Sequence, residues 1–459
     1  MPTLPTTGSV YFLGIGGIGM SALGRYFLSK GWKVYGYDRT PTSLTDSLIR
    51  EGMLIHFEED IKQIPEDINL VIYTPAIPAD HSEYLYLRKK NTRMMKRAEV
   101  LGAIADGYTT IAIAGTHGKT TTTTLCAHLL TQSGVGCQAF LGGISKNYEN
   151  NLLLSKTSNH LVAEADEFDR SFMQLHPSIA VITSIDADHL DIYGNHKAML
   201  DSFSSFTGNI RPGGSLILKS KLDLELQLAG DCKLYRYSME DTADFSATGI
   251  RLIHGLYHFD FSHPEGIIED IILGLPGLYN VENAVAALAA CWLSGASEDE
   301  LRIGLASFQG VRRRFDIRIN REELVYIDDY AHHPAELKAS ITAARNLFAG
   351  RKLTGIFQPH LYSRTKDFAD DFARSLELLD EIILLPIYPA RENPIPGVTS
   401  EMLLSKIQSA SKKLVLKSEL PACLDRNSIE VLITLGAGDI DTLVDPIENY
   451  LNSIPDHKI

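Results

Sequence analysis

A short glycine-rich segment carries the strongest chemical signal in the sequence. Residues 115–120 read Gly-Thr-His-Gly-Lys-Thr, between an apolar stretch at 109–114 and a stretch typical of a helix. The backbone N–H groups of such a loop bind phosphate oxygens, its lysine binds the β- and γ-phosphates, and its hydroxyl binds Mg²⁺. The loop is shorter than the full P-loop pattern, because Ile113 stands where that pattern has its first glycine. We predict a nucleotide site here; the alternative is a turn that happens to contain Gly-Lys-Thr.

A second glycine-rich segment, residues 14–19, reads Gly-Ile-Gly-Gly-Ile-Gly, and Asp38 lies 19 residues beyond its last glycine. Taken alone, this pattern predicts NAD or FAD. The glycines themselves indicate only that a diphosphate can approach the N-terminus of a helix, so any ligand that carries a diphosphate fits. Tight packing of a strand against a helix, without a ligand, is the other interpretation.

Acidic residues follow two predicted strands in the middle of the chain. Glu164, Asp166 and Glu167 follow the first strand, and residues 186–191, which include His189, follow the second. Strand ends beside a phosphate loop are where oxygen ligands of Mg²⁺ are expected. A histidine ligand is less expected for this ion. Solvated loop carboxylates are the alternative for each single residue.

Two segments nearer the C-terminus also combine polar residues with a predicted strand end. Residues 330–334 read Tyr-Ala-His-His-Pro directly after two aspartates, although the proline also fits the first turn of a helix. Residues 358–365 include Arg364, which can bind a carboxylate through two parallel hydrogen bonds. A surface ion pair is the alternative role for this arginine.

Alternating strands and helices must position these motifs. Apolar strands are predicted at Val10–Leu13, Thr109–Ala114 and Leu324–Asp329, each directly before a motif. Short buried strands separated by amphipathic helices indicate parallel sheets that are covered on both faces. Helices are also predicted at 280–293 and 366–379, and residues 248–273 alternate like antiparallel strands.

The length of 459 residues suggests about three domains. We predict an α/β fold with an N-terminal Rossmann-like domain at 1–106, a central P-loop-type ATPase domain at 107–312 and a C-terminal Rossmann-like domain at 313–459.

The bulk composition excludes several classes of protein. The net charge is −14 and no basic cluster occurs, which argues against nucleic acid as a partner. The five cysteines are scattered, as expected for reduced thiols. The N-terminus lacks the basic region of a signal peptide, and no apolar run reaches the roughly 20 residues of a membrane span. We therefore expect a cytoplasmic protein without membrane partners.

Taken together, the motifs resemble the Mur ligase family. The resemblance extends through all three predicted domains and keeps the family's order and approximate spacing. It rests on FLGIGGIGMSALG, AGTHGKTTTT, EADEFDRSF, DADHLDIYG, GLYNVENAVAAL, GVRRRFD, DDYAHHP, FQPHLYSRT and LGAGDID.

The resemblance implies an ATP-dependent ligase that joins a carboxylate to an amine during the cytoplasmic synthesis of peptidoglycan precursors. In the branch that it resembles most, the lactyl carboxylate of UDP-N-acetylmuramate takes the γ-phosphate of ATP, and L-alanine attacks the acyl phosphate. ATP and Mg²⁺ are the implied cofactors. Phosphorylation is needed because a carboxylate is a poor electrophile, and the repulsion between two anions calls for a lysine and a metal ion.

The resemblance also implies roles for individual residues. The UDP-sugar site would contain Gly14, Ile15, Gly16, Gly17, Ile18, Gly19 and Asp38. The ATP site would contain Gly115, Thr116, His117, Gly118, Lys119, Thr120, Thr121, Asn280, Asn283, Arg313 and Asp329. Metal ligands would be Thr120, Glu164 and His189. The amino-acid pocket would contain Tyr330, His360 and Arg364. The catalytic set would be Lys119, His189, Glu164, His332 and Arg364.

The sequence departs from the family pattern at one position of the amino-acid pocket. Some relatives carry arginine directly after the histidine that matches His360, whereas this chain has Leu361. Later-acting family members also place a modified lysine about 15 residues beyond the aspartate that matches Asp188, where an ungapped count reaches Phe203. The missing lysine favours the alanine-adding branch.

Three other functions are compatible with parts of the pattern. A murein-recycling ligase would attach a whole peptide to UDP-N-acetylmuramate. An NAD-dependent oxidoreductase would use the first glycine loop but leave the second motif unexplained. A non-catalytic nucleotide-binding module would leave the carboxylates at the strand ends without a role. The oligomeric state stays open.

Overall fold

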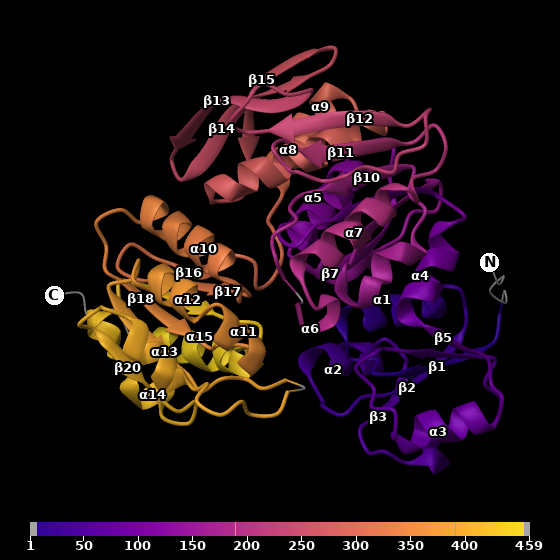
Figure 1. Ribbon diagram of the computed structural model, residues 1–459, viewed down its shortest axis with the longest axis horizontal. Helices are drawn as coiled ribbons and strands as arrows, with labels where there is room; N and C mark the ends of the chain where they lie inside the picture. The colour runs from indigo at the N-terminus through magenta and orange to yellow at the C-terminus, as the bar shows by residue number, and fades with distance from the viewer. Residues whose placement is uncertain (1–6, 189, 391, 454–459) are drawn as a thin grey trace. The chain divides into compact units, whose positions relative to one another are not determined.

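The computed structural model describes residues 7–188, 190–390 and 392–453 (Figure 1). The chain forms two compact units. The first runs to Arg251 and also contains His258–Gly274 and Glu282–Gln309; the second contains Leu252–Tyr257, Leu275–Val281 and the residues from Gly310 onward. No helix within the described ranges has the length and apolar character needed to cross a membrane.

The first sheet is entirely parallel. Its strands are β1 (Ser9–Leu13), β2 (Lys33–Tyr37), β3 (Leu54–His56), β4 (Leu70–Tyr73) and β5 (Met94–Lys96), in the order β3-β2-β1-β4-β5. The accompanying helices are α1 (Ile18–Ser29), α2 (Ser43–Arg50), α3 (Ser82–Lys89) and α4 (Arg97–Ala105). All five residues of β1 are buried, as expected for a central strand that is covered on both faces.

The second sheet is mostly parallel and contains the strands of the middle of the chain. These are β6 (Thr109–Ala114), β7 (Gln138–Ser145), β8 (Asn150–Leu153), β9 (His160–Ala165), β10 (Ile179–Ile182), β11 (Ser215–Lys219), β12 (Lys233–Ser238), β13 (Phe245–Ile253), β14 (Leu256–His263) and β15 (Gly266–Leu273). Their order is β15-β14-β13-β12-β11-β10-β6-β9-β7-β8. Strand β6 therefore lies between β9 and β10, and its parallel pairing with both brings three carboxyl ends to one edge.

The helices associated with this part of the chain are α5 (Lys119–Gln132), α6 (Leu190–Tyr193), α7 (His196–Thr207), α8 (Leu278–Leu293) and α9 (Glu298–Ser307). One apolar cluster extends through both sheets of the first unit, from Val10 and Phe12 of β1 to Ala112 of β6 and Phe206 of α7. Helix α1 packs against β7 and β8. The first two sheets therefore share a core.

The third sheet lies in the second unit. Its strands are β16 (Asp316–Asn320), β17 (Val325–Asp329), β18 (Leu353–Phe357), β19 (Glu381–Leu384), β20 (Lys412–Leu414) and β21 (Val431–Leu435), in the order β16-β17-β21-β18-β19-β20. The helices are α10 (Pro334–Leu347), α11 (Tyr362–Asp367), α12 (Ala369–Leu376), α13 (Ser400–Lys406), α14 (Leu420–Cys423) and α15 (Val444–Asn452). Ile327 packs in a cluster with α10 and α12, whereas its neighbour Tyr326 packs with α14 and α15. Both faces of this sheet are therefore covered.

The predicted elements agree with the structure except at one helix. Strand β6 has the predicted bounds, and residues 248–273 form strands that are joined by short turns. The helix predicted at 366–379 is wrong, because α11 and α12 meet at Phe368, whose φ of −116° and ψ of 19° lie outside the helical region.

Candidate active site

The phosphate loop lies between the end of β6 and the first turn of α5. Gly115 and Gly118 have φ values of +134° and +80°, a region that favours glycine. A Cβ atom on Gly115 would lie 2.1 Å from Oγ1 of Thr183. The backbone N–H of His117 donates a hydrogen bond to Oγ of Ser184 at 2.7 Å. The residues after β10 therefore fix the shape of the loop at the N-terminus of α5.

Lys119 begins α5 and turns back across the loop. Its Nζ donates to the carbonyl oxygen of Gly115 at 2.6 Å and to Oε1 of Glu167 at 2.8 Å. Burial by itself lowers the pKa of Lys119, but Glu167, Asp166 and Glu164 together raise it above its ordinary value. Lys119 is therefore held as a cation at the strand edge that gathers the ends of β6 and β9.

Glu167 is fully buried. Burial raises the pKa of its carboxyl above the ordinary value, although the charge of Lys119 acts in the opposite direction. Its backbone carbonyl accepts a hydrogen bond from Tyr193 at 2.6 Å. The sequence places Glu167 among the acidic residues after β9 but gives it no role; its spacing of three residues from Glu164 was the available signal.

Glu164 faces the first turn of α5 from the end of β9. Oγ1 of Thr120 donates to Oε2 of Glu164 at 2.9 Å. A Cβ atom on Gly142 of β7 would lie 1.9 Å from the same carboxylate oxygen. The absence of a side chain at Gly142 is therefore what makes room for Glu164 beside Thr120.

A hydroxyl and a carboxylate side by side fit Mg²⁺, which takes oxygen ligands and retains several waters. Thr120 and Glu164 supply this pair. His189, the third predicted ligand, lies outside the described residues. Among the residues that the structure describes, no group of three or more His, Cys, Asp or Glu side chains is arranged to hold a metal ion.

Three further residues of the predicted ATP site lie on the loop or in α5. Oγ1 of Thr116 is 3.0 Å from Oγ of Ser184. Nε2 of His117 lies 3.6 Å from Oδ2 of Asp186. Thr121 is buried in the first turn of α5. Thr116 and His117 therefore connect the phosphate loop to the residues after β10.

Two further residues predicted for the ATP site, Asn280 and Asn283, both lie on α8 but have different surroundings. A Cβ atom on Gly118 would lie 2.6 Å from Oδ1 of Asn283, which also accepts from Oγ1 of Thr122 at 3.4 Å. Asn283 is thus next to the phosphate loop. Asn280 is buried, and its Nδ2 donates to the carbonyl oxygen of Pro276 at 2.7 Å.

The first glycine segment forms a tight turn between β1 and α1. The backbone N–H groups of Gly14 and Ile15 both donate to the carbonyl oxygen of Tyr37, at 2.8 and 3.1 Å. The N–H of Gly16 donates to Oδ2 of Asp38 at 2.8 Å. The carboxylate of Asp38 is therefore a hydrogen-bond acceptor for the backbone of this loop. Gly17 caps α1, and Ile18 and Gly19 form its first turn.

A pocket of about 90 Å³ lies between the first turn of α1 and the end of β9 in the first unit. Its lining includes Ile18, Gly19, Arg97, Gly142, Glu164 and Asp166. One pocket therefore borders the first turn of α1 and the carboxylate that faces Thr120.

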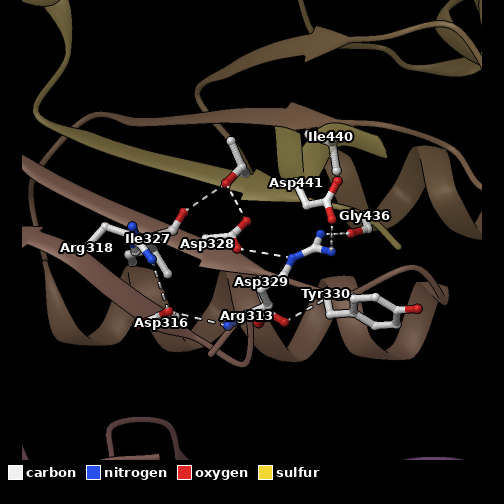
Figure 2. A network of polar contacts seen from close by, with 12 residues as sticks. Arg313, Asp316, Arg318, Ile327, Asp328, Asp329, Tyr330, Gly436, Ile440 and Asp441 are labelled. Carbon is white, nitrogen blue, oxygen red and sulfur yellow. Dashed lines mark hydrogen bonds and ion pairs between the residues drawn. The ribbon is translucent and has the colours of Figure 1, made fainter. Parts of the chain in front are cut away.

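In the second unit, Arg313 is the centre of a polar network at the carboxyl ends of β17 and β21 (Figure 2). Its Nη2 donates to the carbonyl oxygen of Gly436 at 2.7 Å, and its Nε donates to Oδ2 of Asp328 at 3.3 Å. Nη1 lies 3.5 Å from Oδ2 of Asp441. Its guanidinium also lies over the ring of Tyr330, 5.1 Å from the centroid.

Asp329 is buried at the end of β17. Oδ2 accepts from Oγ of Ser340 at 2.6 Å, and Oδ1 accepts from the N–H of Ala331 at 3.1 Å. Burial raises the pKa of Asp329 to about 6, although the hydrogen bond from Ser340 lowers it. This carboxyl therefore titrates closer to neutral pH than a solvated aspartate.

Two of the three residues predicted for the amino-acid pocket, Tyr330 and His360, lie next to His332. The ring of His332 is 5.2 Å from that of Tyr330 and 5.9 Å from that of His360, centroid to centroid. Nδ1 of His332 lies 3.2 Å from Oε2 of Glu336. The following residue, His333, caps α10 by accepting from the N–H of Ala335, so its role is structural.

Leu361 connects His360 to α11, where Arg364 is buried. Leu361 has a φ of +69° and a ψ of 137°, a combination that non-glycine residues rarely adopt. Its side chain is buried. Leu361 therefore packs into the protein, and Arg364 is the residue of this segment that was predicted to bind a carboxylate.

Comparisons with known proteins agree with this architecture. Three family descriptions match: "Mur ligase family, catalytic domain" at residues 9–109, "Mur ligase middle domain" at 113–291 and "Mur ligase, glutamate ligase domain" at 313–439. The predicted three-domain α/β fold is confirmed. The domain bounds that we predicted stay predictions.

Relatives match over nearly the whole chain. The UDP-N-acetylmuramate–L-alanine ligase of Parabacteroides distasonis is 54% identical over 448 residues, 96% of this chain and 97% of the relative. The protein of the same name from Flavobacterium johnsoniae is 48% identical over 97% of this chain and 98% of the relative.

A solved structure shows the same fold. The crystal structure of UDP-N-acetylmuramate-alanine ligase from Thermotoga maritima superposes with a TM-score of 0.83 at 27% identity, and covers 97% of this chain and 100% of that one. With three matching family descriptions and relatives this similar, the chain belongs to the Mur ligase family.

Proposed function

We propose that the chain joins L-alanine to the lactyl carboxylate of UDP-N-acetylmuramate, with conversion of ATP to ADP and phosphate. The observation that carries the proposal is the pocket that borders both Gly19 of the diphosphate loop and Glu164 beside the phosphate loop. A ligand whose diphosphate binds at α1 and whose acid reaches Glu164 fits this arrangement. Relatives that are 45–54% identical over nearly the full chain carry the corresponding name.

The first step transfers the γ-phosphate to the carboxylate. The loop amides at the N-terminus of α5 bind phosphate oxygens, and Lys119 neutralises the charge that develops on the transferred group. The lactyl oxygen attacks phosphorus, the bond to the β-phosphate oxygen breaks, and ADP leaves. Asn283 and Asn280 on α8, with Arg313 and Asp329, are the proposed contacts for the remainder of the nucleotide.

Thr120 and Glu164 are the proposed ligands of Mg²⁺, together with His189. The ion would supply charge neutralisation between the carboxylate and the γ-phosphate. Within the protein, the hydrogen bond between Thr120 and Glu164 already orients both oxygen atoms, and Gly142 keeps the space for them.

The second step needs an amine held as the nucleophile. Tyr330, His360 and Arg364 are the proposed pocket for L-alanine, with Arg364 as the partner of its carboxylate. His332, which lies between Tyr330 and His360, is the proposed polar neighbour of the amine. The nitrogen attacks the acyl carbon, phosphate leaves with the electrons of the broken bond, and the amide forms.

Release of phosphate from ATP tests the proposal directly. With UDP-N-acetylmuramate present, L-alanine should give release and a new amide, whereas UDP-N-acetylglucosamine, which lacks the lactyl acid, should give neither. Turnover with the tripeptide L-alanyl-γ-D-glutamyl-meso-diaminopimelate but not with L-alanine would establish the recycling function instead. Absence of any ATP-dependent product would contradict both.

A further inference from the structure

Arg97 is an arginine that the reaction described above does not use. It is the first residue of α4, and its side chain is 25% exposed. Its Nη2 donates to Oδ2 of Asp166 at 3.1 Å. The guanidinium therefore connects the N-terminus of α4 to the acidic residues that follow β9.

The opposite side of the guanidinium lies against α1. A Cβ atom on Gly19 would lie 2.4 Å from Nη1 of Arg97 and 3.4 Å from its Cζ. Glycine at position 19 is thus what allows the guanidinium to approach the first turn of α1. Within the described parts of the chain, Nη1 and Nε of Arg97 form no hydrogen bond.

The pocket described above brings these features together. Gly19, Arg97, Glu164 and Asp166 all line it. A helix N-terminus and an arginine with unused N–H groups both favour an anion, and they do so independently of each other. Asp166 compensates part of the charge of Arg97 while no ligand is bound, and it fixes the orientation of the guanidinium.

We propose that Arg97 binds the diphosphate of UDP-N-acetylmuramate through Nη1, while Asp166 holds Nη2. The inference rests on the proposed function and assigns a further binding residue to it. The diphosphate is favoured over the lactyl carboxylate because Nη1 faces the first turn of α1, whereas the carboxylate must reach Lys119 and Glu164.

The structural alternative is that Arg97 only ties α4 to the residues after β9. The chain offers a matched control for this role. The preceding residue, Lys96, forms an ion pair with Asp169 at 3.4 Å, so it connects the same two segments. Its side chain is 47% exposed and does not line the pocket.

Titration calorimetry with the full-length protein tests the proposal. The proteins are wild type, Arg97→Met, Arg97→Lys and Lys96→Met, and the ligands are UDP-N-acetylmuramate and UDP-N-acetylglucosamine, which share the diphosphate. Arg97→Met should weaken both ligands by the same factor, about 10- to 100-fold, which is the range for a hydrogen-bonded charge. Arg97→Lys should restore part of the loss, and Lys96→Met should bind both ligands like wild type.

The other outcomes are distinguishable. Equal binding by Arg97→Met and wild type, or an equal loss in Lys96→Met, would overturn the proposal in favour of a structural role. A loss restricted to UDP-N-acetylmuramate would overturn the diphosphate assignment, because only that ligand has the lactyl acid. If wild type bound neither ligand, the proposed function itself would fail. Thermal unfolding of each variant checks that it is folded. If Arg97→Met does not fold, the comparison of Arg97→Lys with wild type tests the proposal.

Discussion

Nζ of Lys119 lies 2.7 Å from Oε2 of Glu167, at the edge where β6 and β9 end. The lysine is therefore already paired with a buried carboxylate before any nucleotide binds. A γ-phosphate that approaches Lys119 enters a site whose positive charge is partly compensated, so the loop amides and the metal must contribute to its binding.

Replacing Lys119 should remove phosphoryl transfer. In Lys119→Met, the rate of phosphate release should fall about 100- to 1,000-fold, because no cation then neutralises the charge that develops on the γ-phosphate. Folding should persist, since burial raises the pKa of Glu167 and lets that carboxyl take up a proton. Lys221→Met removes an ammonium whose side chain is 68% exposed, and it should behave like wild type. Retained turnover in Lys119→Met would disprove the role.

Gly142 should be required for the position of Glu164. In Gly142→Ala the new methyl group would lie 1.9 Å from Oε2, so the carboxylate must move away from Thr120. The Mg²⁺ concentration for half-maximal activity should rise at least about tenfold, as for other groups that support metal ligands. Gly230→Ala makes the same change where no atom lies within 4 Å, and should leave this concentration unchanged. An unaltered magnesium dependence in Gly142→Ala would mean that Glu164 is not a ligand.

Arg364 should affect the amino acid and not the nucleotide. In Arg364→Ala, the KM for L-alanine should rise about 10- to 100-fold from the loss of a charged hydrogen bond, while the KM for ATP stays within about twofold. Initial rates with each substrate varied in turn measure both values. Arg374→Ala, whose side chain is 68% exposed, is the control. Equal increases in both KM values would show that Arg364 acts on the fold or on the whole site.

Asp329 should make stability depend on pH. Burial raises its pKa to about 6 in the folded chain, above the ordinary value of 3.8. The stabilisation from the protonated carboxyl is therefore complete below about pH 4 and is lost as the pH rises through about 6, up to about 3 kcal/mol in total. In calorimetric unfolding of the wild type, the melting temperature should therefore fall as the pH rises from about 4 to about 6.

Asp329→Asn keeps a neutral side chain of the same shape. The dependence of its stability on pH should therefore lose the part that Asp329 contributes. A variant with the full wild-type slope would place the titration elsewhere, with Asp328 and Glu167 as the next groups to test, because burial also raises the pKa of these carboxyls.

The motifs could be predicted from the sequence because each follows a short apolar strand. β6 and β17 end directly before Gly115 and Tyr330, so the strand pattern alone gave their place at a sheet edge. Contacts between distant residues could not be predicted in this way. Glu167 pairs with Lys119, 48 positions away, and its neighbour Asp166 instead contacts Arg97. Spacing identifies a strand end, but the direction of each side chain depends on the surrounding packing.

The break between α11 and α12 shows the same limit. Residues 366–379 have helical periodicity, but the backbone angles leave the helical region at Phe368. Phe368 packs against the cluster beneath α10, and its ring lies 4.9 Å from that of His333. Tertiary packing therefore decides where α11 ends, and the local sequence does not predict this end.

The apolar cluster that extends from β1 to α7 has a consequence for protein engineering. Tyr26 of α1 lies 5.6 Å from Phe140 of β7, and Asn151 of β8 donates to the carbonyl oxygen of Ile18 at 2.6 Å. A chimaera that takes residues 1–106 from a distant homologue would therefore combine surfaces that do not match. Grafts that alter nucleotide-sugar preference have to carry the facing segment, residues 138–153, along with the transplanted sheet.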